Sequence, residues 1–238
     1  MTNNLKYSQD YTVTFSYIDN RGITRPSAIA DFMQDAATVH EIKLGILKGN
    51  GFWVLSKLKY NLKRPLLPYE TVSVATWCGD VKGAIWYRNF SFHVEGELIG
   101  TGTTAWVVLD RETHKIIRPA SIPSYESFLP DEKTGEKLGK IPKYDITSSG
   151  FHTVNYSDID INNHLNNVKA VDIISNAIEL HNYKDEFVSE IQVNYLAESY
   201  VGDKLIINMS KTNQNKINIY AEYGNKSRFE AEMILSRR

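Results

Sequence analysis

The sequence has few of the features that mark exported, membrane-embedded or nucleic-acid-binding proteins. It contains a single cysteine, Cys78, so no disulfide can form within the chain. The first residues lack the basic-then-apolar pattern of a secretory signal, and no apolar run approaches the roughly 18 residues of a membrane span. The formal net charge is −1, with no long basic run. We therefore expect a soluble protein of the reducing cytoplasm that binds no nucleic acid.

What the sequence does have is an internal repeat. Each half opens with a strand-like run, at 11–17 and at 150–156, followed by Asp-rich turn residues and a helical pattern. Four identical pairs lie 141 residues apart: Ser16 and Ser157, Asp19 and Asp160, Asp31 and Asp172, and Ala36 and Ala177. The identities are few, but the repeated order of elements indicates two related units.

Each unit is predicted to contain one helix followed by strands. Pro26 suits the first turn of a helix, which Gly45 would end. Between them runs an apolar stripe at helical spacing, made of Ile29, Phe32, Met33, Ala36, Ala37 and His40. Alternating strands are expected from Phe52 to about Leu109. The second unit repeats this plan, with a stripe at Val168, Val171, Ile174, Ile178 and His181 and strand-like runs near 187–197, 203–210, 215–223 and 227–235.

A proline-rich segment separates the two units. Residues 119–148 hold four of the seven prolines and a mixed-charge run, 131–137, which is typical of a linker that crosses the surface. We expect an N-terminal domain at 1–118, this linker, and a C-terminal domain at 149–238. A helix wrapped by an antiparallel sheet, repeated once, is an α+β architecture. A tandem hotdog is one such fold, although the periodicity alone also fits other α+β tandems.

The most informative segment is 157–169, at the start of the second helix. Asp160, Asn162 and His164 alternate there, so in an extended chain they would bring a carboxylate, an amide and an imidazole to one side. The simpler interpretation is that aspartate and asparagine form turns and cap the helix. The pattern alone leaves both interpretations open, and we interpret 166–167 as caps or turn residues in either case.

This segment, DIDINNHLNNVK, resembles the Asp-x-Asn-x-His block of acyl-acyl carrier protein thioesterases. VNYLAESYVGD at 193–203 resembles the strand of that family that bears a catalytic glutamate, and 105–119 resembles its tryptophan-containing strand. The resemblance spans nearly the whole chain and implies a double hotdog, with the acyl chain held largely by the N-terminal domain. It implies catalytic roles for Asp160, Asn162, His164 and Glu198. Because the chain begins without the extension that targets plastid members, it resembles the bacterial members.

The activity that the resemblance implies is hydrolysis of fatty acyl-acyl carrier protein. A thiol, with a pKa of roughly 8.5, leaves with little proton assistance, so attack on the carbonyl is the harder step. We expect Glu198 to act as general base if burial raises its pKa, with Asp160 and His164 holding the water and Asn162 orienting them or the substrate. Direct attack by Asp160 is the alternative. Backbone N–H groups at the second helix would stabilise the oxyanion. Ser199 replaces a cysteine of some plant members and has no evident partner as a nucleophile.

The first half is predicted to lack an intact site. Asp19 occupies the repeat position of Asp160, but Arg21 and Ile23 replace the amide and the imidazole. This asymmetry favours a division of labour in which one domain binds and the other reacts. On a strand of the first half, Lys57, Lys59 and Lys63 share one face, either as solvated charges or as a docking face for the acidic carrier protein.

Three other functions remain open from the sequence. An acyl-CoA thioesterase would differ only in the carrier, and a hotdog dehydratase or hydratase would use the same histidine and carboxylate to move protons. A noncatalytic lipid-binding module would hold the chain without reacting, which the clustered polar residues argue against. The six histidines show no ligand spacing, so no metal and no cofactor is expected. A monomer and a homodimer are both compatible with a tandem chain.

Overall fold

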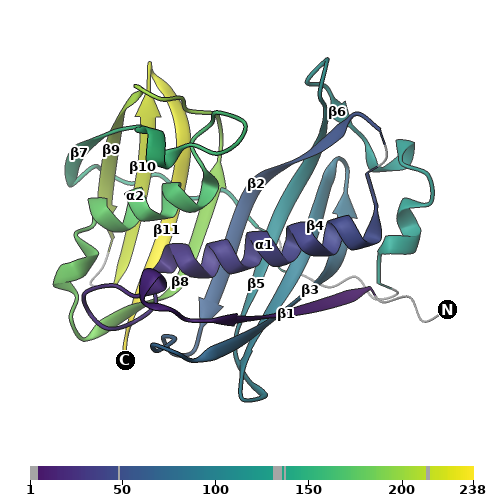
Figure 1. Cartoon of the computed structure of the whole chain (residues 1–238). Coiled ribbons are helices and arrows are strands. Elements are labelled where there is room, and N and C mark those ends of the chain that lie inside the picture. Colours follow the sequence, from purple (N-terminus) through teal and green to yellow (C-terminus); the bar gives the residue numbers. More distant parts are fainter. Residues whose placement is uncertain (1–4, 48, 131–135, 137, 213–214) are drawn as a thin grey trace.

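The computed structural model describes residues 5–47, 49–130, 136, 138–212 and 215–238. The strands form one antiparallel sheet, and both helices pack on the same face of it (Figure 1). The helices are α1 (Pro26–Leu44) and α2 (Asn167–Ala177). The strands are β1 (Lys6–Thr12), β2 (Gly51–Leu62), β3 (Thr71–Lys82), β4 (Ile85–Val94), β5 (Glu97–Asp110), β6 (Ile116–Ile117), β7 (Ser148–Thr153), β8 (Glu186–Tyr195), β9 (Lys204–Lys211), β10 (Lys216–Tyr223) and β11 (Lys226–Arg237). This arrangement is α+β, as predicted.

The two halves of the chain share the sheet through a central strand pair. The sheet order is β1-β3-β4-β5-β2-β8-β11-β10-β9-β7, with β6 beside β5. Strand β2 pairs antiparallel with β8, from Lys57 opposite Asn194 to Asn61 opposite Glu190. Each half therefore curls around its own helix while the backbone hydrogen bonding continues from one half into the other.

Helix α1 begins and ends where the sequence predicts. Pro26 occupies the first turn, and Gly45 adopts a left-handed conformation (φ 60°) that closes the helix. All six residues of its predicted apolar stripe are buried. Helix α2 is shorter than predicted because the chain turns at Glu179, which has a φ of 52°, so His181 lies in a separate 3-10 turn, Leu180–Asn182.

The repeat is confirmed in the backbone, although the two strand-like runs end earlier than predicted. Strands β1 and β7 stop at Thr12 and Thr153, and each is followed by a 3-10 turn, Phe15–Tyr17 or Tyr156–Asp158. Isolated bridges then join Ile18 to Thr24 and Ile159 to Leu165, again 141 residues apart. In the second half the Asp158 carboxylate accepts a hydrogen bond from the Asn155 N–H at 2.9 Å, a local alternative to strand pairing.

The segment that follows β6 covers two of the three lysines that were predicted to share a surface. It contains the 3-10 turns Pro119–Ser121 and Tyr125–Phe128; part of the mixed-charge run 131–137 lies outside the described residues. Lys57 Nζ donates to the carbonyls of Leu138 and Gly139 at 3.1 and 2.8 Å. Lys59 Nζ lies 2.6 Å from the carboxylate of Glu136 and 3.2 Å from that of Glu190. These two lysines hold this segment against the sheet, which counts against a docking face at Lys57 and Lys59, the second of the two interpretations.

Neither helix in the described part of the chain is long and apolar enough to cross a membrane.

Candidate active site

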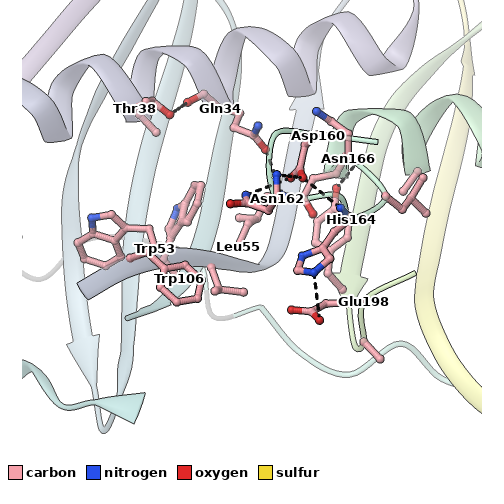
Figure 2. A pocket seen from close by; sticks show the side chains of 18 of the residues that line it. Gln34, Thr38, Trp53, Leu55, Trp106, Asp160, Asn162, His164, Asn166 and Glu198 are labelled. Atoms are coloured by element: carbon pink, nitrogen blue, oxygen red, sulfur yellow. Dashed lines mark hydrogen bonds and ion pairs between the residues drawn. The ribbon is translucent and has the colours of Figure 1, made fainter. Parts of the chain in front are cut away.

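Asp160, Asn162 and His164 lie in a tight turn, and not in an extended segment. Asp160 Oδ1 accepts hydrogen bonds from the backbone N–H groups of Asn162 (2.8 Å) and His164 (3.3 Å), and the Asp160 N–H donates to the His164 carbonyl at 2.8 Å. Asn163 takes the left-handed conformation, with a φ of 61°. Of the two interpretations that the sequence left open, the turn is the one found, because the Asp160 carboxylate satisfies the backbone locally. The turn nevertheless brings the three side chains together beside Glu198 (Figure 2).

Glu198 lies in the loop after β8, since that strand ends at Tyr195 and does not extend to the glutamate as expected. Two contacts fix this loop against the turn. The N–H of Leu165 donates to the carbonyl of Ser199 at 2.8 Å, and Arg228 Nη1 donates to the carbonyl of Glu198 at 2.6 Å. The second half of the chain therefore positions the glutamate through its backbone and leaves its carboxylate available.

The Glu198 carboxylate lies next to an imidazole and a phenol. His164 Nε2 is 3.4 Å from Glu198 Oε2, and the Tyr200 hydroxyl donates to the same oxygen at 2.8 Å. This hydrogen bond raises the pKa of Tyr200 above its usual value. The Tyr200 ring also meets the His164 ring edge-on, with centroids 5.2 Å apart. The side chain of Glu198 is 53% exposed, so it lacks the burial that was expected to make it a stronger base.

Tyr200 is the neighbour that the sequence reasoning missed. The available signal was its position two residues after Glu198, which would place both side chains on one side of an extended segment.

A cavity of about 1350 Å³ extends from these polar groups into the first half of the chain. Asp160, Asn162, His164 and Glu198 all line it. Most of its apolar lining comes from the first half, including Ile46, Leu47, Trp53, Leu55, Trp86 and Trp106. In Figure 2, Trp53 and Trp106 lie well to one side of His164 and Glu198, so the polar and aromatic parts occupy different regions of the cavity.

Helix α1 lines this cavity mainly with residues outside its apolar stripe. Gln34, Ala37, Thr38 and Glu41 face it, whereas Ile29, Phe32, Met33 and Ala36 pack in the core. Ala37 is the member of the stripe that lines the cavity. The sheet curls around two sides of α1, so the stripe and the cavity lining are adjacent faces of one helix.

The first half repeats the turn without counterparts of His164 and Glu198. The Arg21 N–H donates to Asp19 Oδ1 at 2.8 Å, and the Asp19 N–H donates to the Ile23 carbonyl at 2.9 Å, as in the second half. Arg21 also forms an ion pair with Asp19 (2.6 Å). The Thr24 N–H donates to the Leu66 carbonyl, as the Leu165 N–H donates to the Ser199 carbonyl in the second half. Pro65, which precedes Leu66, therefore occupies the position of Glu198, which precedes Ser199.

The residues at the start of α2 divide between capping and cross-helix contact. Asn166 Oδ1 accepts from the Val168 N–H at 2.8 Å, which confirms its predicted role as a cap. The side chain of Asn167 donates to Gln34 Oε1 of α1 at 3.3 Å. Because the Val168 N–H donates to Asn166, it is not available to a substrate oxygen. Ser199 is 2% exposed, and its Oγ has no hydrogen-bond partner in the described part of the chain.

The described residues contain no group of three or more His, Cys, Asp or Glu side chains that could hold a metal ion.

A repeated helix-in-sheet unit with one polar cluster at the edge of a large cavity defines a double hotdog protein with a single candidate site. Family models match both halves: residues 4–121 match the acyl-ACP thioesterase N-terminal domain and 143–233 its C-terminal domain. The chain belongs to the acyl-ACP thioesterase family.

Solved structures share the fold over almost the full chain. An acyl-ACP thioesterase from Bacteroides thetaiotaomicron is 24% identical, with a TM-score of 0.85 over 99% of this chain and 100% of that one. A 12:0-ACP thioesterase from Umbellularia californica is 17% identical, with a TM-score of 0.86 over 99% and 95%.

Curated relatives are longer than this chain. A chloroplastic acyl-[acyl-carrier-protein] hydrolase from Cuphea viscosissima is 22% identical over 74% of this chain, but the match spans only 48% of that protein. A chloroplastic dodecanoyl-[acyl-carrier-protein] hydrolase from Cinnamomum camphora is 26% identical over 72% of this chain and 50% of its own length. The chain thus spans about half the length of these relatives.

Proposed function

We propose that the protein hydrolyses fatty acyl-acyl carrier protein to a free fatty acid and the carrier thiol. The observation that carries this proposal is the single cavity that joins an aromatic, apolar interior to the His164–Glu198 pair. An acyl chain fits the apolar part, and its thioester carbonyl would then lie at the polar end. The four similar proteins named above are acyl-carrier-protein thioesterases or hydrolases, which supports the same substrate class.

In this proposal Glu198 is the general base. Its carboxylate lines the cavity 3.4 Å from His164 Nε2, so a water bound between the two side chains would lose a proton to Glu198 as it attacks the carbonyl. The carbon–sulfur bond then breaks and the thiolate leaves with little proton assistance. Asp160 is the weaker candidate for the attacking group because its carboxylate already accepts two backbone hydrogen bonds.

Asp160 and Asn162 support the reaction from the turn. Asp160 holds the backbone on which His164 sits, and Asn162 Nδ2 lies 3.5 Å from Asp160 Oδ2, which leaves the amide able to turn toward the substrate. Backbone N–H groups at the start of α2 remain the proposed oxyanion donors, apart from the capped Val168 N–H. We also infer a cytoplasmic location, since Cys78 is a buried free thiol that suits a reducing compartment.

The test is thiol release from acyl-acyl carrier protein and from acyl-CoA over a series of chain lengths. Faster release from the carrier protein at equal acyl chain is the expected result. Faster release from the CoA thioester would indicate an acyl-CoA thioesterase. Formation of an enoyl product without thiol would indicate a dehydratase. Binding of acyl chains by well-folded protein with no release from either carrier would leave only a lipid-binding function.

A further inference from the structure

A buried arginine lines the cavity three strands away from the strand that precedes Glu198. Arg88 of β4 is 7% exposed and lines the cavity. Strands β5 and β2 separate β4 from β8, after which Glu198 follows. Three strand spacings of about 4.8 Å put Arg88 about 14 Å across the sheet from β8. An acyl chain whose thioester lies at Glu198 would run toward this arginine.

Among the described residues, the guanidinium of Arg88 hydrogen-bonds only to neutral groups. Nη1 donates to His40 Nδ1 at 2.8 Å and to Thr76 Oγ1 at 3.3 Å, and Nη2 lies 3.8 Å from Cys78 Sγ. Because arginine has no acceptor, His40 Nδ1 must accept. None of the described carboxylates lies within 4.0 Å of the Arg88 nitrogens.

Arg88 keeps donors that have no partner among the described residues. A guanidinium has five N–H donors, and three have partners among the described residues. Nε has no hydrogen bond among the described residues and is not fully buried, so this donor reaches accessible space, and Arg88 lines the cavity. Burial lowers the pKa of this guanidinium, while the nearby Cys78 and Glu41 oppose the shift. A buried cation without an anionic partner is destabilising in an apolar surrounding, and a ligand oxygen would relieve this.

We propose that Arg88 forms a polar subsite that accepts acyl chains with a hydroxyl or carboxylate oxygen at the distal end. The same subsite disfavours plain alkyl chains that are long enough to reach it. Trp86 and Trp106, which pair across β4 and β5 and line the cavity, make the approach to Arg88 apolar, so only the distal end of a chain meets a polar group. This inference rests on the proposed function for the direction in which the chain lies.

Binding of free acids tests the subsite without requiring hydrolysis. Calorimetric titration of the full chain would compare alkanoates from octanoate to octadecanoate with their ω-hydroxy and α,ω-dicarboxylate counterparts. Above the length that reaches Arg88, the oxygenated acid should bind at least about tenfold more tightly than the alkanoate, since the latter leaves polar donors unpaired. Below that length the two should bind equally.

Three variants separate the guanidinium from general effects. Arg88→Met should abolish or reverse the preference for oxygenated chains, and Arg88→Lys should keep part of the preference for dicarboxylates. Arg64→Met removes an arginine that does not line the cavity and should leave the ratio unchanged. Equal binding of both acids by the native chain at every length would overturn the proposal, as would an unchanged ratio in folded Arg88→Met. If Arg88→Met does not fold, the ratio of affinities that the native chain shows for oxygenated and plain acids tests the proposal by itself. Loss of thiol release with this ratio intact would overturn only the proposed hydrolase function.

Discussion

Replacing Asp160 by alanine should loosen the turn that carries His164. The substitution removes the acceptor of two backbone hydrogen bonds, from the N–H groups of Asn162 and His164. Each such bond contributes on the order of 1 kcal/mol net, so we expect the free energy of unfolding to fall by about 2 kcal/mol. For a chain of this size that corresponds to a decrease in Tm of roughly 4–8 °C.

Asp160→Asn is the matched control, because its amide oxygen can accept the same two bonds while the charge is lost. Thermal denaturation of both variants and of the native chain measures how much the Asp160 hydrogen bonds contribute to stability. Asp160→Asn should melt close to native, and a native Tm for Asp160→Ala would refute the assignment of this carboxylate to the turn. Thiol release by Asp160→Asn then measures the chemical part: a loss of about a hundredfold would indicate that the charge acts in the reaction.

Three further predictions concern residues outside the site. Asp19→Ala leaves the Arg21 guanidinium buried without its carboxylate, so chemical denaturation should show a loss of about 3 kcal/mol; an unchanged midpoint would argue against that pair. Burial raises the pKa of Asp31, so its ionisation opposes folding as pH rises through that value. Asp31→Asn should therefore raise Tm at neutral pH, and the gain should vanish below the ordinary aspartate pKa of about 3.9; an equal gain at both pH values would contradict this. Gly100→Ala would drive a methyl into the Asn61 carbonyl, and a native Tm for that variant would contradict the close approach seen here.

Much of the fold could be predicted because local signals agreed with the tertiary packing. Pro26 and Gly45 define α1 by backbone preferences that hold in any context. The strand runs followed from alternation, and the 141-residue offset between identical residues links the two halves in the sequence itself. The second helix was predicted too long because an apolar stripe continues through Ile178 into a 3-10 turn, where Glu179 takes a left-handed conformation that no pattern indicates.

The structure brings the four candidate residues together, but their geometry could not be predicted. Whether Asp160 projects beside His164 or folds back onto the backbone was left open, since spacing cannot decide between local hydrogen bonds. Glu198 meets His164 only because the loop after β8 is fixed against the turn, a contact between distant segments. For the same reason the covering of Lys57 by the linker was not foreseen.

The measurement that tests the central claim most directly is kcat/KM for thiol release by Glu198→Gln compared with the native chain, on the same acyl-acyl carrier protein. Glutamine has nearly the same shape and can still accept the Tyr200 hydrogen bond, so the fold should be unchanged by thermal denaturation. The account predicts a loss of about a hundredfold or more, because the amide cannot remove a proton from water. Native activity in a folded Glu198→Gln variant would contradict it.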